Sequence, residues 1–413
     1  MVMRSITLVL ILIGSSCVGS LNAQPLDSIL MLVVENNAEL KSLQLEFEAE
    51  LMKADQVSQL ADPQIGVGVP VLRPETRLGP QIMMVSASQM FPWFGTLKAK
   101  GDVVVSMSKV KYERIEAERL MLFNKVKIAY FKIQYLGEKE LILQDVLLQL
   151  HAMKNISLAK VEAGQAFSAN VLRVQLKIDE LKSMIEKIEQ EKLKEYAIIN
   201  ELTLQPWTTA IIPEGEFNLP VISFDLGTYQ NKIQSEFPMI RMLDLQKEVS
   251  QERLKVNQKM GAPKIGIGLD YALVNERSDM DPLYNGRDIL VPKLMLTIPI
   301  YRKAYKAKEQ EELFVQQALD YSKEQLITEL LSSLLQFKAD YDNAVIDNEL
   351  SIQQIATSNL AYNILLADYS SGGRGFDDLL QVQMELLNYQ LKEKQSLLSA
   401  KIAVSNIERI TDY

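Results

Sequence analysis

The sequence contains an internal duplication. Segment 61–68, ADPQIGVG, returns 200 residues later as GAPKIGIG at 261–268, and the segment that begins at Gly164 returns 208 residues later at Gly372. A long match between two halves in constant order means that one structural unit is used twice. Because there are only two copies, the pattern predicts one pseudo-symmetric body rather than a solenoid.

Proline placement marks two tracts of the chain as long helices. No proline occurs between Pro92 and Pro206, and none follows Pro299. Both tracts are rich in Leu, Lys, Glu and Gln, which favours helix. The first tract predicts a helix from Leu97 to Ala163, about 100 Å long if it is continuous. A helix of that length needs a partner helix along it.

The partner helix follows a glycine turn in each copy. After the turn, apolar residues recur three and four positions apart, which is the spacing of a coiled-coil seam. The seam residues are Val171, Val174, Ile178, Leu181, Ile185 and Ile188 in copy one, and Leu379, Val382, Leu386 and Tyr389 in copy two. Each copy therefore predicts an antiparallel helical hairpin, over 97–200 and 302–411.

Two strands are predicted before each hairpin, at about 64–71 and 81–91 and at about 264–274 and 289–299. They alternate apolar residues with small or polar ones, as half-buried strands do. The apolar residues predicted to face lipid are Ile65, Val67, Val69, Ile265, Ile267 and Leu269. Interfacial aromatic residues are predicted at the strand-to-helix junctions, at Phe91, Trp93, Phe94 and Tyr301.

The number of strands raises a question of closure. Four strands cannot close a membrane barrel, because about eight is the observed minimum. Open strand edges in lipid would leave backbone groups unsatisfied. The pattern therefore predicts one of two arrangements: a sheet in water that is covered by other protein, or one barrel that is shared by several chains.

The N-terminus predicts a signal peptide over residues 1–23. Arg4 precedes an apolar stretch, and Leu21-Asn22-Ala23 offers a cleavage site. Lipidation at Cys17 is a second possibility for this segment. The mature chain then divides into a first repeat at 24–200, a joining segment at 201–228 that holds Pro206, Pro213 and Pro220, and a second repeat at 229–413.

The residue counts argue against most catalytic and metal chemistry. The chain has one His and one Cys, which leaves no nucleophile–base pair of the usual kinds and no zinc cluster. The net charge of −9 argues against a nucleic-acid partner. The Gly-rich run 371–375 lacks the Lys-Ser/Thr of a phosphate loop. We therefore predict a protein that is not an enzyme and has no cofactor, metal site or nucleic-acid partner.

The doubled order of elements has a known counterpart. With a G-x-x-x-x-x-[DN]-[VL]-L turn in each half, the chain resembles the TolC-type outer-membrane efflux proteins from about Leu26 to Asp412. The resemblance implies a mainly α-helical homotrimer, with four strands per chain in a 12-stranded membrane β-barrel and with the coiled-coil hairpins in a periplasmic helical tunnel.

The resemblance also implies a place and a role. The place is the outer membrane of a Gram-negative bacterium, in contact with its lipid and with an extension into the periplasm. The role is the exit duct of a tripartite efflux pump, which passively exports small molecules or metal ions. The implied partners are a periplasmic adaptor and an inner-membrane pump of the RND or ABC type.

Specific roles at the two hairpin tips follow from the same resemblance. The adaptor would dock on Val161, Gly164, Ser168, Asn170, Val171, Leu172, Tyr369, Gly372, Leu379 and Leu380. The gate would use Arg374 as a latch and a ring of Asp378 carboxylates around the lumen. These residues also suit an ordinary helical hairpin, because glycine ends helices and Asn170 or Asp378 could cap the returning helix.

Two rival functions fit parts of the same pattern. A type I secretion duct, which exports proteins, would share the whole architecture. A soluble periplasmic coiled-coil scaffold or adaptor would share the hairpins, but it would need neither a trimer nor an apolar outward face on the strands.

Overall fold

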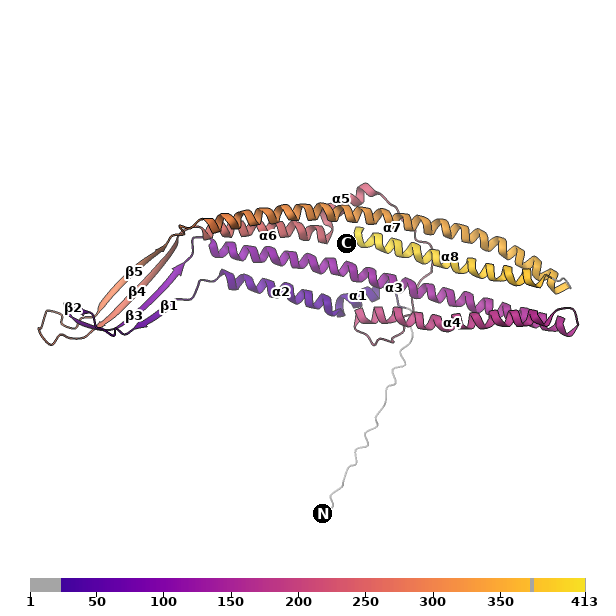
Figure 1. Ribbon diagram of the computed structural model, residues 1–413, viewed down its shortest axis with the longest axis horizontal. Coiled ribbons are helices and arrows are strands. Elements are labelled where there is room, and N and C mark those ends of the chain that lie inside the picture. The colour runs from indigo at the N-terminus through magenta and orange to yellow at the C-terminus, as the bar shows by residue number, and fades with distance from the viewer. Residues whose placement is uncertain (1–23, 372–374, 413) are drawn as a thin grey trace, which may run out of the picture.

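The computed structural model describes residues 24–371 and 375–412. The predicted signal peptide and the tip residues Gly372 and Arg374 lie outside the described residues. The described chain is elongated, with its strands at one end and two helical hairpins reaching the other (Figure 1).

The helices of the described chain repeat in two sets. The first set is α1 (Leu26–Asn36), α2 (Ala38–Ser58), α3 (Thr96–Glu162) and α4 (Ser168–Thr203). The second set is α5 (Leu226–Glu236), α6 (Pro238–Met260), α7 (Lys303–Ser371) and α8 (Phe376–Thr411). The helix expected over 97–163 therefore exists as α3, displaced by one residue at each end.

Each set opens with a helix break that the periodicity did not predict. In the first set, the Asn37 side chain accepts hydrogen bonds from the main-chain N–H groups of Glu39 and Leu40, at 3.0 and 3.1 Å, and so caps α2. In the second set, Pro238 is the first residue of α6, where its missing N–H removes no helical hydrogen bond.

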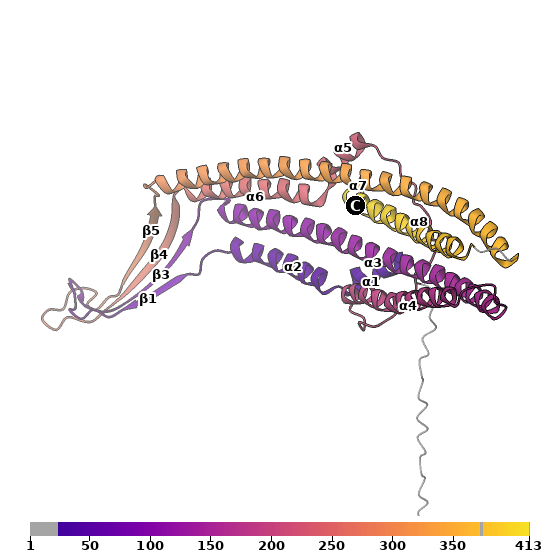
Figure 2. The same cartoon turned by 45° about the vertical axis from the view of Figure 1, so that its right-hand side comes forward.

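Four helices form a layer beside the strands, in the order α2, α3, α6 and α7 (Figure 2). Contacts join each helix of this series to the next. The layer therefore has two edges, α2 at one side and α7 at the other. Farther from the strands, α4 packs on α3, α8 packs on α7, and α3 contacts α8.

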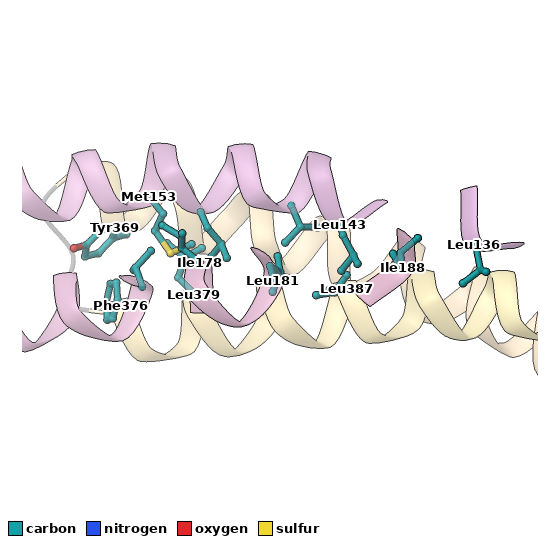
Figure 3. Close-up of a cluster of buried hydrophobic side chains, with 13 residues drawn as sticks. Leu136, Leu143, Met153, Ile178, Leu181, Ile188, Tyr369, Phe376, Leu379 and Leu387 are labelled. Carbon is teal, nitrogen blue, oxygen red and sulfur yellow. The ribbon is translucent and has the colours of Figure 1, made fainter. Parts of the chain in front are cut away.

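The predicted coiled-coil seam is confirmed in the hairpin half of the molecule. Val174, Ile178, Leu181 and Ile188 of α4 are fully buried. They belong to one cluster with Leu143 and Met153 of α3 and Leu379 and Leu387 of α8 (Figure 3). The cluster joins the two hairpins into one unit, so the side chains of the seam hold the hairpins together.

The joining segment packs on the middle of the helices. The Tyr130 hydroxyl of α3 accepts a hydrogen bond from the Glu214 N–H at 2.7 Å and donates one to the Gln24 carbonyl at 2.9 Å. Burial raises the pKa of this hydroxyl. The N-terminal end of the described chain and the joining segment are thus pinned to the same side chain.

The strands form one antiparallel sheet, β1 (Gln64–Gly68), β3 (Gly79–Phe91), β4 (Lys264–Val274) and β5 (Ile289–Thr297), with the two-residue β2 (Glu75–Thr76) paired to β3. The order β1-β3-β4-β5 places one strand of each copy at the centre and one at each edge. β1 ends at Gly68 rather than at residue 71, because Pro70 has no N–H for a ladder. β5 ends at Thr297 rather than at 299.

None of the helices in the described part of the chain is both long enough and apolar enough to cross a membrane.

Candidate functional site

One face of the sheet is almost wholly apolar. Residues directly opposite each other on antiparallel strands point to the same face, and one such row runs Ile65, Ala87, Leu269 and Pro292 across all four strands. The same register places on this face Val67, Val85, Phe91, Ile265, Ile267, Tyr271, Leu273, Leu290, Leu294 and Leu296. Because Ile65 is 76% exposed and Leu294 is 80% exposed, this apolar face is uncovered in the single chain.

Gln89 is a polar member of this face, and it lies near the helical end of the sheet. Its amide nitrogen donates to the main-chain carbonyl of Ala61 at 2.8 Å and to that of Met90 at 3.1 Å. The donor group is therefore satisfied by main chain within the molecule.

The opposite face mixes small, polar and apolar residues. Its row through the middle of the sheet runs Gly66, Ser86, Asp270 and Val291, and Asp270 forms an ion pair with Lys293 of the neighbouring strand. Gly266 on this face is covered by the side chains of Met90 and Met295, which a Cβ at that position would meet. The polar and charged residues of the sheet, apart from Gln89, therefore lie mainly on this second face.

The predicted lipid-facing and interfacial residues lie partly as expected. Ile65, Val67, Ile265, Ile267 and Leu269 share the apolar face. Val69 lies past the end of β1, so its assignment to a membrane strand is wrong, although its side chain is exposed. At the junctions, Phe94 is 78% exposed and Tyr301 is 84% exposed, while Trp93 contacts Phe94 edge to face.

The first tip is the turn between α3 and α4. Gly164 has a φ of 70°, in the left-handed region, and its N–H donates to the Val161 carbonyl at 3.0 Å. Phe167 holds the N-cap position of α4 without a side-chain hydrogen bond to the helix, and its ring is 81% exposed. Asn170 is inside α4 and does not cap it, so the capping role expected for Asn170 is wrong.

The second tip is tied to the first through Tyr369. The Lys160 ammonium donates a hydrogen bond to the Tyr369 main-chain carbonyl and lies 4.2 Å from the centroid of the Tyr369 ring. The Tyr369 hydroxyl is 3.2 Å from the Ser157 hydroxyl. Phe376 packs on the Tyr369 ring with centroids 5.7 Å apart, and both residues stand at one end of the buried row (Figure 3).

A second link between the tips is an ion pair on the surface. Arg173 of α4 pairs with Asp377 of α8, and both side chains are largely exposed. Asp378, the expected gate carboxylate, is exposed beside Asp377 and makes no side-chain cap bond to α8. Both acids stand in the first turn of α8, where the helix dipole favours negative charge.

Burial divides the residues that were expected to dock an adaptor. Tyr369 and Leu379 are 2% and 0% exposed. Both side chains are held between the hairpins, so they could contact a partner only if the hairpins part, and their docking role stays a prediction. The remaining docking residues that the structure describes have partly or fully exposed positions: Val161, Gly164, Ser168, Asn170, Val171, Leu172 and Leu380.

Sequence reasoning missed several residues of the tips. Lys160, Ser157 and Arg173 contact residues more than 200 positions away, and no local pattern signals such a contact. Phe167 could have been found from the sequence, because turns consist mostly of small and polar residues and a large aromatic residue there is unusual. Within the described residues, no cluster of His, Cys, Asp and Glu could hold a metal ion.

Known proteins match the chain by structure and not by sequence. Neither a family model nor a curated protein sequence matches it.

Solved structures match it over nearly its full length. A membrane protein from Pseudomonas aeruginosa is 15% identical with a TM-score of 0.75, and the match covers 94% of this chain and 93% of that one. The outer-membrane channel MtrE of Neisseria gonorrhoeae, in its open state, is 15% identical with a TM-score of 0.73, over 94% and 88% of the two chains. The outer-membrane protein VceC of Vibrio cholerae is 12% identical with a TM-score of 0.70, over 94% and 95%. The chain therefore has the fold of the TolC-type outer-membrane channels.

Proposed function

We propose that the chain is the outer-membrane exit duct of a tripartite efflux pump in a Gram-negative bacterium. The observation that carries this proposal is the sheet, whose apolar face is exposed and whose edge strands β1 and β5 have, within the described residues, a neighbouring strand on one side only. An apolar exposed face suits lipid, and free edges suit pairing with further strands. The fold shared with outer-membrane channels supports the same function.

Both halves of the molecule support assembly around an axis. The helical layer ends at α2 and α7, which carry exposed apolar side chains: Leu45 and Met52 on α2, and Phe314 and Tyr321 on α7. If β5 and α7 of one chain meet β1 and α2 of the next, every edge gains a partner by the same rotation. Three chains would then supply the twelve strands of a closed barrel, with the hairpins as a periplasmic tunnel.

The assembled duct would work with partners. Substrate would come from an inner-membrane pump of the RND or ABC type, through a periplasmic adaptor that docks on the exposed residues of the tips. Phe167 joins that docking set, since an exposed aromatic side chain is a common anchor at interfaces. A ring of Asp378 carboxylates would surround the closed end of the tunnel.

In this proposal, each segment of the chain has its own role. Residues 1–23 direct export, the repeats at 24–200 and 229–413 each supply strands and one hairpin, and 201–228 braces the middle of the tunnel wall.

The function can be tested in a strain that lacks the gene. We expect the protein in the outer-membrane fraction as a trimer, and we expect the deletion strain to be more sensitive to drugs, dyes, detergents or metal salts. A soluble monomer would contradict the proposal and favour a periplasmic scaffold. A deletion strain with unchanged sensitivity but a depleted set of secreted proteins would favour a protein-secretion duct.

A further inference from the structure

A cavity of about 1020 Å³ lies where the sheet meets the helical layer. It is lined by the end of α2, the ends of β3 and β4 nearest the helices, the start of α3 and the end of α6, with Lys308 of α7 at its margin. The tips lie at the other end of the molecule (Figure 1), so this cavity belongs to neither the gate nor the docking surface.

The cavity opens on the polar side of the sheet. Met90 and Lys264 line it, and the strand register places both on the face that carries Gly66, Gly266 and Asp270. The apolar face is directed the opposite way. If the apolar face meets lipid, as in the proposed function, the cavity opens into the lumen.

The lining is strongly cationic. Lys100, Arg253 and Lys264 line the cavity, and none of them has a carboxylate within ion-pair distance in the part of the chain that the structure describes. The fourth cation, Lys308, is neutralised by Glu311 and Glu312, at 2.7 and 2.8 Å. Asp62 is the acidic residue in the lining. Three unpaired cations against one acid leave an excess of positive charge, in a protein whose formal net charge is −9.

The rest of the lining is largely apolar. It includes side chains from three helices and from the loop after α2: Val57, Leu60, Leu97, Val103, Val104, Val256 and Met260. An apolar cavity of this size with a few charged groups is typical of sites for organic molecules rather than for small inorganic ions. The cations would fix one end of such a molecule, and the apolar walls would hold its body.

We propose that this cavity binds amphipathic organic anions, with a carboxylate or sulfonate on an apolar body, as they pass along the lumen. The inference rests on the proposed function, because that function makes the cavity luminal. With three chains in the assembly, nine cations would form a collar at the base of the barrel. The collar would favour anionic cargo over cationic cargo of the same size.

Binding can be measured on the purified full-length trimer in phosphatidylcholine nanodiscs. The probes are 1-pyrenesulfonate and 1-pyrenemethylammonium, which share one apolar body and differ in charge. We expect the anionic probe to bind at least tenfold more tightly, and we expect salt to weaken its binding by screening. Replacing all three cations, as K100Q/R253Q/K264Q, should abolish the preference. Each cation is expected to contribute about fivefold to the affinity for the anionic probe.

The matched control is K182Q/K187Q/K194Q, which makes the same charge change at exposed positions of α4. It should keep the preference of the unaltered protein. If the first triple variant fails to form a trimer, the single variants K100Q and R253Q replace it, and each should weaken the anionic probe about fivefold.

Three results would overturn the inference. One is equal affinity of the unaltered protein for the two probes, and another is the same loss in both triple variants. The third is abolition of probe binding in phosphatidylglycerol nanodiscs, which would identify a lipid headgroup as the occupant. The resistance of the complemented deletion strain to uncharged drugs tests separately whether the protein works as an exit duct. If the unaltered protein restores that resistance but binds the two probes equally, only the cavity inference fails.

Discussion

Lys160 of the first hairpin and Tyr369 of the second form a link between the two tips. The lysine ammonium donates to the tyrosine carbonyl and also lies 4.2 Å from the centroid of its ring. Tyr369 is buried against Phe376, so the lysine holds a rigid group rather than a mobile side chain. Lys160 therefore adds a charged contact to the packing and the Arg173–Asp377 ion pair that hold the hairpins together at the tip.

Replacing Lys160 with Met should loosen the tip. The substitution removes a charge-assisted hydrogen bond and a cation–π contact, which together are worth about 1–3 kcal/mol. We expect a higher resting conductance of the trimer in a planar bilayer. Lys187→Met, at an exposed position of the same hairpin, should leave the conductance unchanged. Equal conductance of the two variants would show that the link does not hold the tip closed.

Charge on the two faces of the sheet should have opposite consequences. Ile267→Asp places a carboxylate on the apolar face, where the cost in lipid stays below the about 2–4 kcal/mol of a basic residue at the midplane but is repeated in each chain of the trimer, and we expect loss of outer-membrane assembly. Ser88→Asp places the same group on the polar face, beside Gly268, and should assemble normally. The amount of heat-modifiable trimer on gels of membrane fractions measures the assembly of both variants. Normal assembly of Ile267→Asp would mean that this face does not meet lipid.

Phe167→Ser should separate docking from folding. The ring is exposed, so we expect the thermal midpoint of the trimer to stay nearly unchanged, within about 0.5 kcal/mol of stability. Loss of an aromatic anchor typically costs a complex about 2 kcal/mol or more, so drug resistance of the complemented strain should fall. Leu148→Ser, an exposed apolar position away from the tip, is the matched control. Full resistance with Phe167→Ser would remove this residue from the docking surface.

The pair of buried Glu113 and exposed Arg241 predicts a pH dependence of stability. Burial raises the pKa of the Glu113 carboxyl above its usual value of 4.5, and Arg241, at 2.8 Å, opposes that rise. A raised pKa means that the ionised carboxylate weakens the folded state, and that this cost fades as the pH falls toward the unfolded value.

Arg241→Ala removes the opposing charge, so the pKa of Glu113 should rise further. We expect the variant to lose about 1–3 kcal/mol of stability near pH 8 and less near pH 5. Glu113→Gln should remove the difference between the two pH values, alone and in combination with Arg241→Ala. Thermal melts at both pH values test this, and a loss that does not depend on pH would mean that Glu113 is not its source.

The elements that the sequence predicted well are those with a long local signal. The proline-free tracts and the seam from Val174 to Ile188 extend over many helical turns, so a few ambiguous residues could not change the outcome. The breaks at Asn37 and Phe237 were missed because each interrupts a helix over one residue. A signal was present for the second break, because the residue before Pro238 is disfavoured in helix, but the periodicity alone did not use it.

The tips were harder to predict, because their contacts join the two halves. The glycine turn was clear from Gly164, but nothing near Tyr369 in sequence shows that it would be buried under Lys160. The expected cap at Asn170 failed for a different reason: Phe167 already begins the helix three residues earlier. Local chemistry predicts turns, whereas packing between distant segments decides which turn residues are exposed.

The link between Lys160 and Tyr369 also bears on the origin of the duplicated chain. At the tips the copies are offset by 208 residues, from Gly164 to Gly372, so the counterpart of Lys160 is Asp368 and the counterpart of Tyr369 is Val161. An acid and a valine cannot repeat this contact. A ring of six identical single repeats would have six equal junctions, whereas fusion of two repeats lets sequence drift make alternate junctions different. The duplication therefore allows the two kinds of junction to diverge, and the sequence provides the lysine and the tyrosine for this contact in one arrangement of the copies but not in the exchanged one.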